Sequence, residues 1–283
     1  MTTTTAPDPA ASAPDRAAGE PVRARRSERL LALARAELIL LLRNKTALFN
    51  AVFLGPLLVG FLAAVGGDFL GSDPAAMAAS TLTMLLAMAL LMVVYYNLTT
   101  SMVARREELV LKRLLTGDVT RTEVVVAYAL PGVVITLAQV ALGWVAAAVL
   151  AEPPPVQNAL WLALAAAGGA VVFVLLAVAS SGLTRTVETA QLTTMPLLFG
   201  AMLLSGFTLP LHLMPDVVEQ VASWTPLYPV VTLAQHGFGT HLPDGTPAAG
   251  TLAEVAQPLA CLALWTVLGA ATSRRWMRWE PRR

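Results

Sequence analysis

The sequence predicts an all-α integral membrane protein with six transmembrane helices. An amphipathic helix in the membrane interface precedes the first of them, and a broken re-entrant hairpin joins the fifth to the sixth. Hydrophobic residues make up 56% of the 283 residues and charged residues only 13%, which is typical of helices that face lipid rather than water. Six long stretches also lack any charge, and each supplies the roughly 20 apolar residues that a helix needs to cross a bilayer.

The six uncharged stretches are residues 46–65, 75–103, 124–151, 156–184, 189–209 and 255–273. Two of them begin after a threonine and a glutamate at capping-box spacing, Thr120 with Glu123 and Thr251 with Glu254. In a capping box the two side chains satisfy backbone amides that the first helical turn leaves unbonded. These pairs therefore predict the starts of the third and sixth transmembrane helices.

The basic residues predict the orientation of the helices. If the segments between the stretches are assigned alternately to the two sides of the membrane, all 19 lysines and arginines fall on one side. Positive residues near the ends of transmembrane helices are retained in the cytoplasm. We therefore predict a multi-pass protein of the plasma (inner) membrane with cytoplasmic N- and C-termini.

The two ends of the chain differ from its centre. Residues 1–26 are rich in Thr, Ala and Pro without an apolar core, which predicts a disordered cytoplasmic tail. Residues 27–45 have helical amphipathicity, with Arg35 and Arg43 on the polar side, and are expected to lie in the interface. Glu37 falls on the leucine side and either pairs with a neighbouring element or faces outward at the rim, which we favour. Residues 46–273 form the transmembrane domain, and 274–283 a basic cytoplasmic tail.

Several functional classes lack support in the sequence. It contains no G-x-x-x-x-G-K-[ST] phosphate-binding loop, no H-E-x-x-H zinc motif and no G-x-S-x-G nucleophile turn. We therefore expect no enzyme activity, metal or cofactor in this chain, and no nucleic-acid partner. No charged residue lies near the centre of a predicted transmembrane helix, whereas ion-coupled carriers and proton pumps usually place ionisable groups there.

The segment between the second and third transmembrane helices is dense in charges of both signs. Residues 104–114 read ARREELVLKRL, and Glu108 and Lys112 form a favourable i, i+4 pair. As a helix the segment would also present an apolar ridge. Such a helix suits a groove on a cytosolic partner, but a solvated loop explains the segment equally well.

The segment after the fifth transmembrane helix has the opposite character. Residues 205–238 contain no lysine or arginine and are interrupted by Pro210, Pro215 and Pro226. Between these prolines, residues 216–224 form a short amphipathic stretch. The pattern predicts a broken helical hairpin that dips into the outer leaflet, where protein or water must satisfy its backbone.

Together these features resemble the permease subunit of type-2 ABC exporters, the family that includes bacterial drug-resistance and polysaccharide-export permeases. The resemblance covers about residues 27–283. It rests on the interfacial helix ending in Arg43, the six transmembrane stretches, Arg105-Arg106-Glu107-Glu108 followed by Leu111-Lys112-Arg113-Leu114, and Ser205-Gly206 with Pro210, Met214-Pro215 and Pro226-Leu227. The family often has Gly-Thr after the acidic residues, where this chain has Leu109-Val110.

The resemblance implies an export subunit that has no ATPase site of its own. ATP and Mg²⁺ would bind to a separate cytosolic ATPase subunit, expected in two copies, and a second permease chain would complete a homodimer. By resemblance, the ATPase docks on a coupling segment that contains Arg105, Arg106, Glu107, Glu108, Leu111, Lys112, Arg113 and Leu114. The interfacial helix contributes Arg35, Glu37 and Arg43, and the hairpin that closes the exit contributes Ser205, Gly206, Pro210, Pro215 and Pro226.

The resemblance also directs the second and fifth transmembrane helices toward the dimer axis. Candidate residues for the translocation path are Met84, Met88, Met92, Tyr95, Gln191 and Thr194. Methionine adapts to irregular shapes, although ordinary packing of these residues is the favoured interpretation. A path without formal charge suits a lipophilic or amphiphilic cargo such as a drug, a lipid or a glycan-like molecule. The alternative functions are a membrane-embedded sensor or signalling subunit, and a secondary transporter without an ATPase partner.

Overall fold

The computed structural model describes residues 73–110, 120–150, 152–206, 211, 214–242, 246–248 and 250–277, together with Arg35, Ile39, Phe49 and Leu57. A continuous helical run comes first: α3 (Pro74–Ala89), the π-helical segment η2 (Leu90–Tyr96) and α4 (Asn97–Glu107). The later helices are α6 (Arg121–Leu150), α7 (Ala159–Leu183), α8 (Val187–Leu203), α9 (Asp216–Ala222), α10 (Tyr228–Phe238) and α11 (Leu252–Trp276). Within the described residues the only β-pairing is an isolated bridge between His241 and Pro247.

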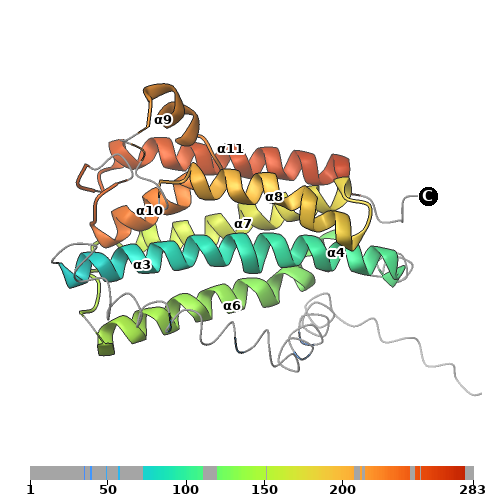
Figure 1. Cartoon of the computed structure of the whole chain (residues 1–283), viewed down its shortest axis with the longest axis horizontal. Helices are drawn as coiled ribbons and strands as arrows, with labels where there is room; N and C mark the ends of the chain where they lie inside the picture. Colours follow the sequence, from blue (N-terminus) through green and yellow to red (C-terminus); the bar gives the residue numbers. More distant parts are fainter. Residues whose placement is uncertain are drawn as a thin grey trace, which may run out of the picture.

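The long helices lie side by side, with α7 behind α3 and α8 in the view of Figure 1. α7 packs against α11, α10, η2 and α4, and is the central helix of the described bundle. The bundle has two distinct ends. α9 and α10 gather at one of them, whereas α4 ends, α8 begins and the chain runs to its C-terminus at the other (Figure 1).

Among the described residues, four helical segments are long and apolar enough to cross a membrane: residues 74–107, α6, α7 and α11. This confirms a multi-pass, all-helical membrane protein. α8 corresponds to the fifth predicted transmembrane stretch and has 17 residues. The first stretch lies outside the described residues, so the count of six stays a prediction.

Two helices extend beyond the stretches predicted for them. The second stretch was expected to end at Val103, but its helix continues to Glu107, so no separate helix begins at Ala104. α11 continues to Trp276, which places Arg274 and Arg275 in its last turn rather than in a tail. The reason is the same in both places, because alanine, arginine and glutamate favour helix and basic side chains complement the C-terminal helix dipole.

One of the two predicted capping boxes is present. The Thr120 amide donates to Oε2 of Glu123 over 2.8 Å, and the Glu123 amide donates to Oγ1 of Thr120 over 3.4 Å. The prediction of a box at Thr251 is wrong, because its side chain makes no cap hydrogen bond. Glu254 instead lies with Oε2 3.8 Å from Nδ1 of His236, a buried residue of α10.

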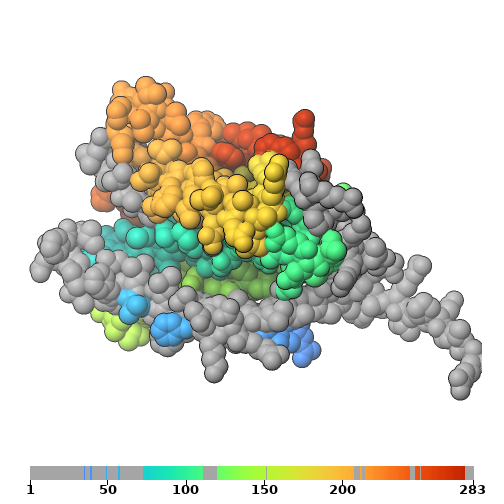
Figure 2. All heavy atoms as spheres, turned by 45° about the vertical axis from the view of Figure 1, so that its right-hand side comes forward, coloured from blue at the N-terminus to red at the C-terminus, as the bar shows by residue number. Residues whose placement is uncertain are grey.

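The core lies where η2, α7 and α10 meet. Leu90, Tyr95, Phe173 and Leu233 are fully buried there. The rings of Tyr95 and Phe173 pack edge to face with their centroids 6.3 Å apart. By contrast, α8 lies on the visible face of Figure 2, beside the run from α3 to α4, and it exposes several large apolar side chains: Leu192, Met195, Phe199 and Leu203.

Candidate functional site

Arg106 fixes the end of α4 to the end of α7. Its side chain is only 1% exposed. Nη1 donates to the carbonyl oxygen of Ser181 over 2.8 Å, and Nη2 donates to the carbonyl oxygens of Thr184 and Arg185. The last carbonyls of a helix have no intrahelical donor and carry partial negative charge. The end of α7 therefore stabilises a guanidinium whose burial would otherwise be costly.

The same stretch of α7 also holds α8 and α11, and we call residues 180–185 the α7 hub. The hydroxyl oxygens of Thr184 and Thr193, on α8, lie 2.8 Å apart. Oγ of Ser181 donates to the sulfur of Met277, just after α11, over 3.4 Å. Ser180 contacts the hydroxyl of Tyr95, with their oxygens 3.0 Å apart. A displacement of α4 at Arg106 would therefore move the α7 hub, which contacts α8, the end of α11 and η2.

Beside this buried anchor, the chain turns outward. Glu107, Glu108 and Leu109 are exposed, and Glu108 forms an ion pair with Arg105 over 3.5 Å. Leu109 has a φ of 59°, in the left-handed region, where the helix ends. We call residues 107–109 the α4 corner. It combines negative charge with an apolar side chain on an exposed surface, directly next to the residue that is bound to the α7 hub.

The backbone at Leu109 provides a prediction. A left-handed conformation costs a non-glycine residue roughly 1–2 kcal/mol, and the leucine side chain is 41% exposed, so few contacts depend on it. Leu109→Gly is therefore expected to raise the free energy of unfolding by up to about 1 kcal/mol, after the greater freedom of glycine in the unfolded chain is subtracted. Thermal unfolding of the purified protein in detergent measures this. Leu109→Ala is the control, because it removes the side chain and retains the strain, so an equal effect of both substitutions would refute the explanation.

The predicted path residues divide into two groups. Met84, Met88 and Met92 are half-buried and Gln191 is exposed. Tyr95 and Thr194 are fully buried. Thr194 donates its hydroxyl to the Ala190 carbonyl oxygen of its own helix over 2.8 Å, and Tyr95 contacts Ser180 and Phe173. These two side chains are packed inside the bundle, so their prediction as lining residues of a path is not supported by their positions.

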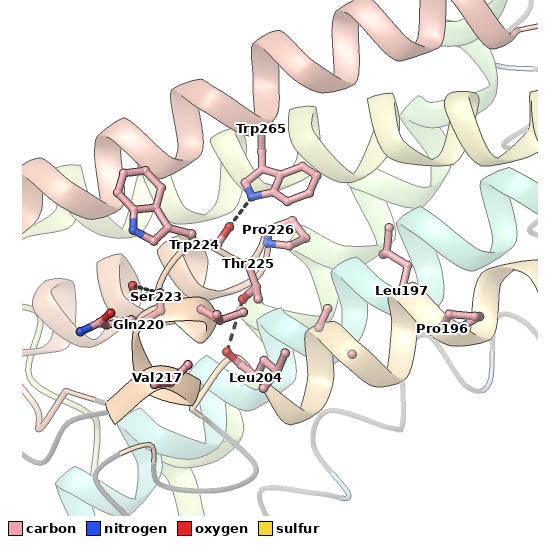
Figure 3. A pocket seen from close by; sticks show the side chains of 13 residues that line it. Pro196, Leu197, Leu204, Val217, Gln220, Ser223, Trp224, Thr225, Pro226 and Trp265 are labelled. Atoms are coloured by element: carbon pink, nitrogen blue, oxygen red, sulfur yellow. Dashed lines mark hydrogen bonds between the residues drawn. The ribbon is translucent and has the colours of Figure 1, made fainter. Parts of the chain in front are cut away.

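The predicted exit residues lie around the turns between α8, α9 and α10. Ser205 is buried, and Gly206 has a φ of 82°, which a glycine adopts without strain and which helps to end α8. Pro215 directly precedes α9, and Pro226 lies two residues before α10. Oγ1 of Thr225 donates to the carbonyl oxygen of Leu204 over 3.3 Å. Nε1 of Trp265 donates to the carbonyl oxygen of Trp224 over 2.8 Å. These bonds attach the hairpin to α8 and α11 (Figure 3).

A cavity of about 880 Å³ lies between α8, the α9 hairpin and α11. Figure 3 shows Leu197 of α8 and Leu204, directly after α8, on one side of it, and Trp224 and Trp265 on another. Its lining residues carry no formal charge, and Gln220 and Ser223 are among the few polar ones. No pattern in the sequence predicts this cavity, because the cavity depends on how the broken hairpin folds back over α8.

Some predicted site residues lie outside the described residues: Glu37, Arg43, Leu111, Lys112, Arg113, Leu114 and Pro210. The predicted tail at residues 1–26 and most of the interfacial helix lie outside them as well. Arg35 is described, and it is helical and exposed. Of the coupling residues predicted from the resemblance, the structure therefore places Arg105, Arg106, Glu107 and Glu108. It brings these four together at the end of α4, with Arg106 turned inward.

The anchoring role of Arg106 was missed, although helical spacing held a signal for it. The buried residues near the end of α4 are Leu98, Thr99, Met102, Val103 and Arg106. They recur every three or four positions, which marks one face of a helix. Arg106 continues this face, whereas Glu107 and Glu108 do not.

Helices that cross a membrane, packed around α7, define a multi-pass membrane protein. A sequence model of the ABC-2 type transporter family matches residues 28–238. This match covers most of the chain, and the chain belongs to that family. It is thus the membrane component of an ABC transporter, a component that is not itself the ATPase and that generally pairs with a cytosolic ATPase subunit. No curated protein matched the chain in a sequence search.

Proposed function

We propose that the chain is the membrane-spanning subunit of an ATP-driven exporter in the plasma (inner) membrane. Two copies form a homodimer, and two copies of a cytosolic ATPase subunit, which bind ATP and Mg²⁺, supply the energy. The observation that carries this proposal is the exposed α4 corner beside the buried Arg106. A partner can bind to the α4 corner, and Arg106 transmits the partner's movement into the bundle.

The proposed mechanism follows from these contacts. ATP binding draws the two ATPase subunits together, and the α4 corner moves with them. Because Arg106 is bound to the carbonyl oxygens of the α7 hub, α7 follows, and the contacts of Thr184 and Ser181 extend the movement to α8 and the end of α11. ATP can shift the equilibrium between two states of the bundle only by as much as its binding free energy differs between those states.

The proposed cargo is lipophilic or amphiphilic. The half-buried Met84, Met88 and Met92, with Gln191 on α8, offer an adaptable surface without formal charge. At the far end, the turns that contain Ser205, Gly206, Pro215 and Pro226 would open and close the exit. This route lies along α8 and the run from α3 to α4. The two contact each other through α4.

The direct test is reconstitution of the chain with a candidate ATPase subunit. The two proteins are expected to copurify, and lipophilic cargo is expected to stimulate ATP hydrolysis in proteoliposomes. A chain that never retains an ATPase subunit, and that moves cargo without ATP, would instead be a secondary transporter.

Charge reversal at the α4 corner provides a sharper prediction. Glu107→Lys with Glu108→Lys changes exposed side chains, so the free energy of unfolding is expected to change by less than about 1 kcal/mol. The transport driven per ATP hydrolysed is expected to fall at least about fivefold, the lower end of typical coupling energies. Vesicle transport and hydrolysis, measured on the same preparation, give this ratio.

Glu152→Lys is the matched control, because Glu152 is also exposed but lies between α6 and α7 at the other end of the bundle. It is expected to leave the ratio unchanged. An unchanged ratio in the Glu107→Lys, Glu108→Lys variant would show that the α4 corner does not couple the two proteins.

A further inference from the structure

A second cavity lies at the same end of the bundle as the α7 hub. It has a volume of about 300 Å³ and opens between the start of α6, the C-terminal half of α7 and the end of α11. Val125, Leu175 and Val178 form an apolar wall, and Ala270 adds to it from α11. A volume of this size is at the lower limit of those that hold small ligands.

The rest of the lining is polar and positively charged. Arg121 is the first residue of α6, Arg274 is in the last turn of α11, and both side chains are exposed. Thr122 and Ser273 place hydroxyl groups beside them. Two guanidinium groups thus stand next to an apolar slot, and this arrangement complements an anion that is attached to hydrocarbon.

We propose that this cavity binds an anionic phospholipid of the cytoplasmic leaflet. The phosphate lies between Arg121 and Arg274, and the beginning of an acyl chain lies along Val125, Leu175 and Val178. Guanidinium groups bind phosphate oxygens through two parallel hydrogen bonds, and basic pockets between transmembrane helices are suited to anionic head groups. A zwitterionic lipid would place its own cation beside the two arginines and is disfavoured.

The bound lipid would contact the α7 hub indirectly. Met277 lines the cavity, and its sulfur accepts a hydrogen bond from Ser181. The lipid would also bridge α6 and α11, both of which contact α7. This inference uses the orientation proposed above, in which the basic end of the bundle faces the cytoplasm, but the site itself requires only the residues that line it.

The test uses the full chain without any ATPase, so its outcome is independent of the proposed export activity. The protein is reconstituted in nanodiscs that contain equal amounts of phosphatidylglycerol and phosphatidylcholine, released into mild detergent, and examined by native mass spectrometry for retained lipid. The wild-type chain is expected to retain phosphatidylglycerol preferentially. Arg274→Ala and Arg121→Ala are each expected to lower this retention about fivefold, as the loss of one basic residue near an anionic head group implies.

Arg275→Ala is the matched control, because Arg275 is the next residue of the same helix, is exposed, and does not line the cavity. It is expected to retain the lipid as the wild type does. Ala270→Trp fills the slot and keeps both arginines, so it is expected to lower retention as well. Thermal unfolding of each variant identifies any that fail to fold. Arg274→Lys keeps the charge but loses the paired hydrogen bonds, so it is expected to retain an intermediate amount of lipid.

Three results would overturn the proposal. Equal losses from Arg274→Ala and Arg275→Ala would indicate a diffuse positive surface rather than a site. Full retention by Ala270→Trp, or displacement of the lipid by millimolar inorganic phosphate, would indicate a site for phosphate alone. Equal retention of phosphatidylcholine would show that the two arginines select no lipid.

Discussion

Replacing Arg106 by alanine is expected to lower the free energy of unfolding by about 3–5 kcal/mol, because it removes several hydrogen bonds to a charged group, each worth roughly 1.5–3 kcal/mol, and this loss exceeds the cost of burying the guanidinium. The substitution leaves the carbonyl oxygens of Ser181, Thr184 and Arg185 without the donors that Arg106 supplies. It also opens a space in a position that is almost fully buried. Thermal unfolding of the purified chain in detergent measures the loss.

Two substitutions serve as controls for this result. Arg105→Ala removes a partly exposed ion pair, with Glu108 3.5 Å away, and is expected to cost less than about 1 kcal/mol. Arg106→Lys keeps the charge but cannot reach three carbonyl oxygens at once, and should fall between the two. If Arg106→Ala were as stable as Arg105→Ala, the connection between α4 and the α7 hub would not be a stabilising contact.

Gly182→Ala is expected to destabilise the protein by roughly 1–3 kcal/mol or more, the usual range for overpacking. An added Cβ would lie 2.1 Å from the carbonyl oxygen of Trp276 and 2.5 Å from its carbonyl carbon. Because these are backbone atoms, no side-chain rotation can relieve the clash, and the end of α11 must move away from α7. Thermal unfolding reports the destabilisation, and the distance between spin labels on the ends of α7 and α11 reports the movement.

Gly200→Ala is the same chemical change in a different environment. Gly200 lies inside α8, and a Cβ there would meet nothing within 4 Å. Because alanine favours a helix interior over glycine by about 1 kcal/mol, this variant is expected to be more stable than the wild type. The two substitutions should therefore have opposite signs, and a Gly182→Ala variant of wild-type stability would contradict the close packing of α7 and α11.

The transmembrane helices could be predicted from the sequence because one physical requirement determines them. A stretch such as 156–184 must be long and uncharged to cross a membrane, and the corresponding α7 runs from Ala159 to Leu183. Its start is shifted by a local feature, since the side chain of Asn158 accepts a hydrogen bond from the Leu160 amide over 3.0 Å. The end of the fifth stretch was predicted at 209, whereas α8 ends at Leu203, shortly before the left-handed Gly206.

The inward position of Arg106 was harder to predict. Charge counting treats an arginine near the end of a transmembrane helix as a cytoplasmic surface residue. The partners of Arg106 are backbone carbonyls of a helix about 75 residues later in the chain, which no local pattern reveals. Thr251 and Glu254 illustrate the same limit, because their spacing fits a capping box but the packing of α10 brings His236 close to Glu254.

Cross-linking from the α4 corner tests the central claim most directly. A photoreactive residue at Leu109, in membranes that contain the chain and its candidate ATPase subunit, is expected to cross-link to that subunit, and the yield is expected to change when ATP binds. The same residue at Gln220, on α9 at the opposite end of the bundle, should give no such product. A cross-link to the ATPase subunit from Gln220 and none from Leu109 would contradict both the proposed docking surface and the proposed orientation.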